Sequence, residues 1–139
     1  MTSNRDGSTR VNKLVLDPGA TLNALSSGYT LSVTTLGDDF IDMGTGATIS
    51  GAQVTVGVSS VGSFSQKALS GINTDFNINF VGVSTFTMTG DWTINGNMTA
   101  HGSTSSTSEG NATKIRTNGR NLTVQGNLTL GNTNSGFPY

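Results

Sequence analysis

Cysteine is missing from the sequence and histidine occurs once, and both shortages narrow the chemistry open to the protein. Without cysteine there is no disulfide framework, no thiol nucleophile and no cysteine metal site. Nothing in the sequence places a serine and an acid beside His101, and there is no Gly-x-Ser-x-Gly motif. The eight acidic residues are scattered and do not form a recognisable glycosidase pair. We therefore predict that the protein is not an enzyme and has no catalytic residue.

Charge is also scarce, at 11% of residues with a net charge of −1. This balance argues against nucleic acid or an anionic membrane as a partner. Three basic residues and three acidic ones do gather, which fits either two solvated loops or a complementary contact between subunits: Lys114, Arg116 and Arg120, and Asp38, Asp39 and Asp42. The acidic group offers oxygen ligands for calcium but lacks the EF-hand spacing. We predict no metal site, no cofactor-binding residue and no cofactor.

Long hydrophobic runs are absent as well. No segment approaches the roughly 18 apolar residues of a membrane-spanning helix. Residues 1–10 are polar and lack the apolar region of a signal peptide. We expect a protein made in the cytoplasm without an export signal and without a membrane partner.

What the chain has in abundance is Thr (22), Gly (19), Ser (17) and Asn (14), which together exceed half of its 139 residues. With 33% hydrophobic residues it is too polar for a helical bundle, yet too rich in spaced aliphatic residues to be disordered. Either a thin repetitive β-structure or an oligomer with a shared core satisfies this composition, and the two are compatible. We expect a homo-oligomer, preferably a trimer, whose subunit contacts cover the large apolar residues Phe76, Phe80, Phe86, Trp92 and Phe137.

A six-residue phrase occurs four times, at residues 91–96, 97–102, 121–126 and 127–132. Each copy opens with Asn or Asp and continues with an apolar residue, Thr, and a smaller or apolar residue, a two-residue alternation typical of a half-buried strand. The Gly-Asn junctions between hexads allow turns, and Asn95-Gly96 could equally make a type I′ hairpin. The repeat predicts that four residues point into one core: Leu122, Val124, Leu128 and Leu130. Thr123 and Thr129 are predicted to point outward.

Further strand patterns recur every eight to twelve residues without helical periodicity, apart from one helical turn that Lys67–Ser70 would allow. The expected strands are residues 11–16, 21–25, 29–35, 40–43, 48–58, 72–80 and 84–89. The fold class is therefore all-β, with a β-solenoid or intertwined β-prism as the first choice and a β-sandwich or jelly roll as the second. The expected organisation is a polar arm over 1–10, one β-rich domain over 11–132 with a flexible insert at 103–110, and a tail over 133–139.

The segment Thr85-x-Thr87-x-Thr89 resembles one row of the ice-binding surface of antifreeze β-solenoids. Such surfaces need matching rows on successive strands, whereas the hexads carry one Thr each. An exposed strand face rich in Thr explains the pattern equally well. Ice binding is kept as a remote alternative.

The phrase Asn-Leu-Thr-Val-Gln-Gly-Asn-Leu-Thr-Leu-Gly, residues 121–131, resembles a phrase common in bacteriophage tail fibres, tail spikes and other virion surface proteins. The resemblance extends over residues 84–132, and bacterial adhesins share it. It implies a virion location and a structural role, here a capsid decoration (cement) protein or short head spike bound to the major capsid protein or other virion proteins. A receptor- or glycan-binding fibre or adhesin segment is the alternative. The terminal residues expected to contact the capsid or a neighbouring subunit are Arg5, Arg10, Phe137 and Tyr139.

Overall fold

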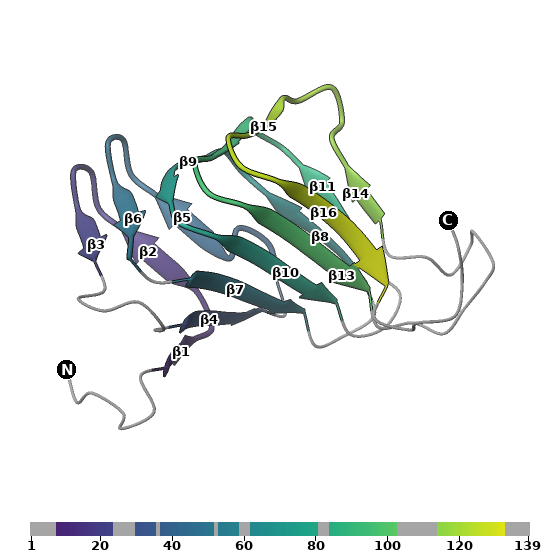
Figure 1. Cartoon of the computed structure of the whole chain (residues 1–139), viewed down its shortest axis with the longest axis horizontal. Coiled ribbons are helices and arrows are strands. Elements are labelled where there is room, and N and C mark those ends of the chain that lie inside the picture. Colours follow the sequence, from purple (N-terminus) through teal and green to yellow (C-terminus); the bar gives the residue numbers. More distant parts are fainter. Residues whose placement is uncertain are drawn as a thin grey trace.

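The protein is a stack of coils built from short parallel strands (Figure 1). A computed structural model describes residues 8–23, 30–35, 37–51, 53–58, 62–80, 84–102 and 114–132. Every strand pairing within these residues is parallel, and each pairing joins two strands that are one coil apart in the chain. Three strands make one coil, so the chain turns through three sides before it returns to the first.

The strands of successive coils are as follows. The first coil has β1 (Ser8–Val11), β2 (Leu14–Leu16) and β3 (Thr21–Asn23). The second has β4 (Thr30–Thr35), β5 (Ile41–Met43) and β6 (Thr48–Ser50). The third has β7 (Gln53–Val58), β8 (Gly62–Gln66) and β9 (Leu69–Asn73). The fourth has β10 (Phe76–Phe80), β11 (Ser84–Met88) and β12 (Trp92–Ile94). The fifth has β13 (Met98–Gly102), β14 (Lys114–Arg116) and β15 (Leu122–Val124), and β16 (Leu128–Asn132) begins the next coil.

The coils stack into sheets that form the sides. One side is a six-stranded sheet in the order β1-β4-β7-β10-β13-β16, which runs from purple to yellow in Figure 1. A five-stranded sheet, β15-β12-β9-β6-β3, forms another side, and the remaining side holds the sheets β14-β11-β8 and β2-β5. The predicted all-β class is confirmed. The second choice of fold, a β-sandwich or jelly roll, does not fit, because those folds are antiparallel and the described strands pair in parallel.

Several predicted strand boundaries were wrong because the chain bends where the pattern looked continuous. The predicted strand over 48–58 divides into β6 and β7 beside Gly51, whose φ of 79° turns the chain at a corner. The predicted strand over 11–16 likewise divides into β1 and β2, and 72–80 into β9 and β10. Lys67–Ser70 forms no helical turn, because Leu69 starts β9. The predicted arm over 1–10 was too long, because the backbone from Ser8 onward pairs with β4.

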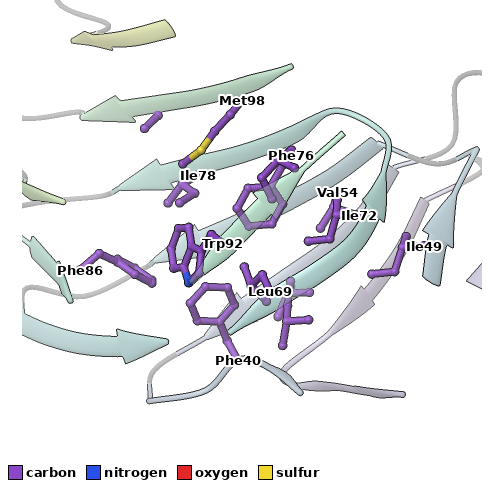
Figure 2. Close-up of a cluster of buried hydrophobic side chains, with 14 of the residues drawn as sticks. Phe40, Ile49, Val54, Leu69, Ile72, Phe76, Ile78, Phe86, Trp92 and Met98 are labelled. Carbon is purple, nitrogen blue, oxygen red and sulfur yellow. The ribbon is translucent and has the colours of Figure 1, made fainter. Parts of the chain in front are cut away.

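The interior of the coils is filled by one cluster of apolar side chains (Figure 2). Trp92 is fully buried and meets Phe76 edge-to-face, with ring centroids 6.3 Å apart. Phe86 is also fully buried, and its ring centroid lies 5.1 Å from that of Phe40 and 5.9 Å from that of Phe64. Inward side chains from three sides meet within one chain, so the expectation that subunit contacts cover Phe76, Phe86 and Trp92 was wrong. The low share of hydrophobic residues in the sequence made the core of a single chain look too small. Each strand contributes only one or two inward side chains, but the strands of all three sides add to the same cluster.

One polar side chain, Gln66, is buried completely in this interior. Its Nε2 donates to the carbonyl oxygen of Ile41 at 2.7 Å and to that of Lys67 at 3.2 Å, and its Oε1 accepts from the Ile41 N–H at 3.2 Å. Strands β5 and β8 belong to different sheets. The amide of Gln66 therefore satisfies backbone groups of β5 that a neighbouring strand would otherwise pair.

Candidate functional site

The opening residue of each hexad lies at a corner and connects one coil to the next. The side-chain Oδ1 of Asp75 accepts the backbone N–H of Asn97 at 3.0 Å and also its Nδ2–H at 3.0 Å. The Oδ1 of Asn97 in turn accepts the N–H of Asn127 at 2.9 Å. At another corner the carboxylate of Asp91 receives the N–H of Asn121 at 3.0 Å and its Nδ2–H at 3.4 Å. The repeat therefore specifies a ladder of corner hydrogen bonds, a role that the sequence pattern alone did not indicate.

The acidic group at residues 38–42 serves the same structural purpose. The Oδ1 of Asp38 accepts the Ser65 N–H at 2.6 Å, and the Oδ1 of Asp39 accepts the Lys67 N–H at 2.8 Å. Asp39 takes a positive φ of 50° to reach this position. These carboxylates are thus already occupied by backbone donors of the following coil, an arrangement that does not fit the calcium hypothesis.

The third acid, Asp42, forms an ion pair with Lys67 on the partly exposed surface. The hydrogen bond from Lys67 lowers the pKa of the Asp42 carboxyl, against a smaller opposing effect of desolvation. The electrostatic attraction of Lys67 and Lys13 acts in the same direction as the hydrogen bond. This pair is a contact between the second and third coils.

The single histidine does not belong to a chemical site within the described residues. His101 lies in β13, opposite Asn79 on one side and Gly131 on the other, and its side chain is half-buried. In the part of the chain that the structure describes, no three His, Cys, Asp or Glu residues gather closely enough to hold a metal ion. The expected absence of an enzyme activity and of a metal stays a prediction.

Outward-facing residues form polar rows along the stack. On the five-stranded sheet, Thr21 pairs with Thr48 and their hydroxyls hydrogen-bond at 3.2 Å, and Thr93 pairs with Thr123. Beside this row, Asn95 donates from Nδ2 to the Oδ1 of Asn73 at 2.6 Å. The six-stranded sheet carries a similar row, which comprises Ser32, Thr55, Asn77, Thr99 and Thr129. Thr85 and Thr87 lie on a third sheet beside Ser63 and Ser65. Neighbouring members of a row are about 4.8 Å apart, the spacing between strands.

The final coil exposes apolar residues that the sequence placed in the core. Leu128 and Leu130 pair in register with Met98 and Ala100, which are buried, so they lie on the inward-facing side of β16. Even so, Leu128 is 47% exposed and Leu130 is 60% exposed. Their predicted inward orientation is correct, but the burial expected from it was wrong, because no described strand covers β16 on its outer edge.

Other residues of the same hexads follow the prediction more closely. Leu122 and Val124 are half-buried and pack against the core, whereas Thr123 and Thr129 are exposed. The turn at Asn95-Gly96 is not a hairpin, since it connects β12 to β13 on two different sheets.

The basic residues noted in the sequence and the exposed leucines both lie on the final coil, a name used for the fifth coil together with β16. Lys114 and Arg116 flank the inward-facing Ile115 on β14, and Arg120 lies in the turn before β15. Arg116 and Arg120 are exposed and Lys114 is half-buried. The described residues of this coil, 98–102 and 114–132, contain no carboxylate. The C-terminal edge, defined as β14, β15 and β16 with these side chains, is therefore both apolar and positively charged.

The residues predicted to make terminal contacts fall mostly outside this description. Arg10 lies in β1 and pairs in register with Ser32. Arg5, Phe137 and Tyr139 lie outside the described residues, as do the predicted insert over 103–110 and the tail over 133–139. Sequence reasoning missed the exposed edge residues Leu128 and Leu130, and the only signal for them was that their hexad is the last of four.

Comparison with known proteins gives no assignment. No family model matches the chain, and no curated protein and no solved structure matches it. Within the residues that the structure describes, no helix is sufficiently long and apolar to traverse a membrane. The function must therefore be argued from the surface of the coil stack.

Proposed function

We propose that the protein is a structural component of a bacteriophage particle, a capsid decoration (cement) protein or short head spike that binds and reinforces the capsid surface. The observation that supports this role is the C-terminal edge, where Leu128 and Leu130 are exposed on strands that pair on one side only. Exposed apolar residues on an unpaired strand edge favour attachment to another protein. The proposed partners are the major capsid protein or other virion proteins.

The rest of the described surface fits a protein that must remain soluble before assembly. Polar rows cover the outer faces of the sheets, while the large aromatic side chains Phe76, Phe86 and Trp92 are enclosed in one chain. The proposed trimer no longer depends on a shared core.

The experiment is mass spectrometry of phage particles purified by density gradient from the lysate of a producing culture. A decoration protein is expected in the particles at several hundred copies, and image reconstruction should place it on the capsid exterior. Its absence from purified particles, with other capsid proteins present, would contradict the proposal. Presence at only a few copies on the tail would favour the alternative of a receptor- or glycan-binding fibre segment.

A second function, ice binding, is favoured by one observation. Thr21 and Thr48, and then Thr93 and Thr123, form a row on the outer face of the five-stranded sheet. Regularly spaced hydroxyl and methyl groups on a flat face can order water in a repeating array. Gly71 interrupts the row in the third coil, which weakens this case. Measurement of thermal hysteresis with the isolated protein tests it, and a freezing point equal to the melting point would exclude it.

A further inference from the structure

The C-terminal edge has the features needed to pair with one more layer of extended chain. Strands β14, β15 and β16 each end a sheet, so the backbone groups on their outer edges have no strand partner among the described residues. The side chains that face the interior at this edge, Leu128 and Leu130, are exposed. One coil earlier the same register positions hold Met98 and Ala100, and β16 buries them. A strand laid on β16 would bury the two leucines in the same way.

The corner residues point to the same conclusion. Asp75 and Asn97 each accept a backbone N–H from the coil that follows them. Asn127 occupies the next position of this ladder and its side chain is exposed. Asn121 similarly follows Asp91 at the other corner and is exposed. An added extended segment would therefore meet side-chain acceptors at two corners as well as strand edges on the sides.

The positive charge of the C-terminal edge indicates which kind of chain could bind there. Lys114, Arg116 and Arg120 lie on the final coil without a carboxylate among its described residues. Two copies joined through this edge would bring like charges together, which costs free energy at a contact. The opposite end of the stack carries both a basic residue, Lys13, and an acidic one, Asp17, near its first strands, so head-to-tail joining gains little from charge. An acidic segment of a different protein is the complementary occupant.

We propose that the C-terminal edge binds an extended segment of a partner protein that follows β14, β15 and β16 in turn, with carboxylates beside Lys114, Arg116 and Arg120 and apolar side chains over Leu128 and Leu130. The segment would add strands to the exposed sheet edges, a recurring mode of peptide recognition. This inference rests on the proposed function only for the identity of the partner, since the edge can be tested with the isolated protein.

The test uses a fluorescently labelled twenty-residue peptide of alternating Val and Glu, long enough to follow residues 114–132 along β14, β15 and β16, with a Val-Lys peptide of equal length as its control. Binding is read from fluorescence anisotropy. The Val-Glu peptide should bind and the Val-Lys peptide should not. Leu130→Asp should weaken binding by about tenfold or more, since it replaces apolar contact by a charge that repels glutamate. The double variant Lys114→Glu, Arg116→Glu should weaken it by a similar factor and reduce its salt dependence.

Matched controls lie at the other end of the stack. Val15 is 59% exposed on β2, and Lys13 is an exposed basic residue beside it. Val15→Asp and Lys13→Glu should leave peptide binding unchanged, and circular dichroism should show that all variants keep the β spectrum. Because Leu130 is largely exposed, its replacement is not expected to unfold the protein.

Four results would overturn the proposal. Equal binding of the Val-Glu and Val-Lys peptides, or no effect of Leu130→Asp, would show that the edge does not recognise such a segment. Self-association in sedimentation that Leu130→Asp disperses would make a second copy the occupant. Peptide binding that starts only after residues 133–139 are deleted would make that segment of the chain the occupant. Absence of the protein from phage particles would reject the virion role without changing any of these readouts.

Discussion

The side-chain Oδ1 of Asn97 accepts the backbone N–H of Asn127 at 2.9 Å, across thirty residues of sequence. The N–H of Asn97 is itself bound by the carboxylate of Asp75, one coil earlier. One side chain at the start of a hexad therefore helps to hold three successive coils in register. This explains why each hexad opens with Asn or Asp, whose short side chains place an oxygen close to the backbone.

Replacement of Asn97 by alanine is expected to lower the free energy of unfolding by about 1–2 kcal/mol. The change removes the acceptor of the Asn127 N–H and the Nδ2–H bond to Asp75, while the backbone bond from the Asn97 N–H remains. Urea denaturation followed by circular dichroism measures the loss. Gln125→Ala is the control, because Gln125 is an exposed amide on the same surface. Equal effects of both substitutions would refute the structural role of Asn97.

Gly96→Ala is expected to destabilise the fold by about 1–3 kcal/mol or more, since the added methyl group has no space. A Cβ on Gly96 would clash with the carbonyl carbon and oxygen of Thr74 in the preceding coil. Gly37→Ala is the control, because a Cβ at that position would meet nothing within 4 Å. Thermal unfolding should separate the two variants clearly, and similar melting temperatures would mean that the coils do not approach so closely at this corner.

Met98→Ala is expected to cost about 2–5 kcal/mol, the usual range for truncating a fully buried side chain. Leu128→Ala, at the same register position on β16, should cost no more than about 1 kcal/mol because Leu128 is 47% exposed. Chemical denaturation of both variants provides the comparison. A larger loss at Leu128 than at Met98 would show that β16 is covered in the isolated protein.

The Asp42–Lys67 pair predicts a small dependence of stability on pH. The pKa of Asp42 is lowered in the folded protein, chiefly by the hydrogen bond from Lys67. A lowered folded-state pKa adds stability above the unfolded value of about 4, and this stability is lost as pH falls through the folded value. Asp42→Asn should therefore lower stability at pH 7 but not at pH 2. Because the pair is partly exposed, the difference at pH 7 should stay below about 1 kcal/mol.

A result opposite in sign would identify a different cause. If Asp42→Asn were more stable than the unmodified protein at pH 7, desolvation of the carboxylate would outweigh its interaction with Lys67. Lys67→Met provides a second comparison, because it removes the charge of the partner and keeps most of the side-chain length. Both variants should show the same small change at pH 7 if the pair acts as a unit.

The all-β class and the inward-outward alternation of the hexads could be predicted from the sequence. The pairing could not, because hexads adjacent in sequence lie on different sheets. Trp92 pairs with Leu122 and Met98 with Leu128, each thirty residues apart. Alternation shows which side chains share a face of a strand, but it does not show which strand lies beside it.

The candidate site, like the fold, could be predicted from the sequence only in part. Clusters of like charge were visible in the sequence, but their roles depended on the neighbouring coil. Asp38 and Asp39 bind backbone N–H groups of residues 65 and 67, a contact across more than twenty residues. The exposure of Leu130 could not be predicted either, since its pattern is the same as that of buried residues and only its place at the last strand differs.

The connection between β13 and β14 shows where the length of such a chain can vary. Strands β10 and β13 are offset by 22 residues and β13 and β16 by 30, yet both pairs remain in register. Seven of the eight additional residues fall between β13 and β14, because β11 and β14 are offset by 29 residues, and one falls between β14 and β15. Length can therefore vary at this connection while the ladders above and below keep their alignment. A foreign epitope inserted between residues 103 and 113 would be carried by a scaffold that has already accommodated an insertion there.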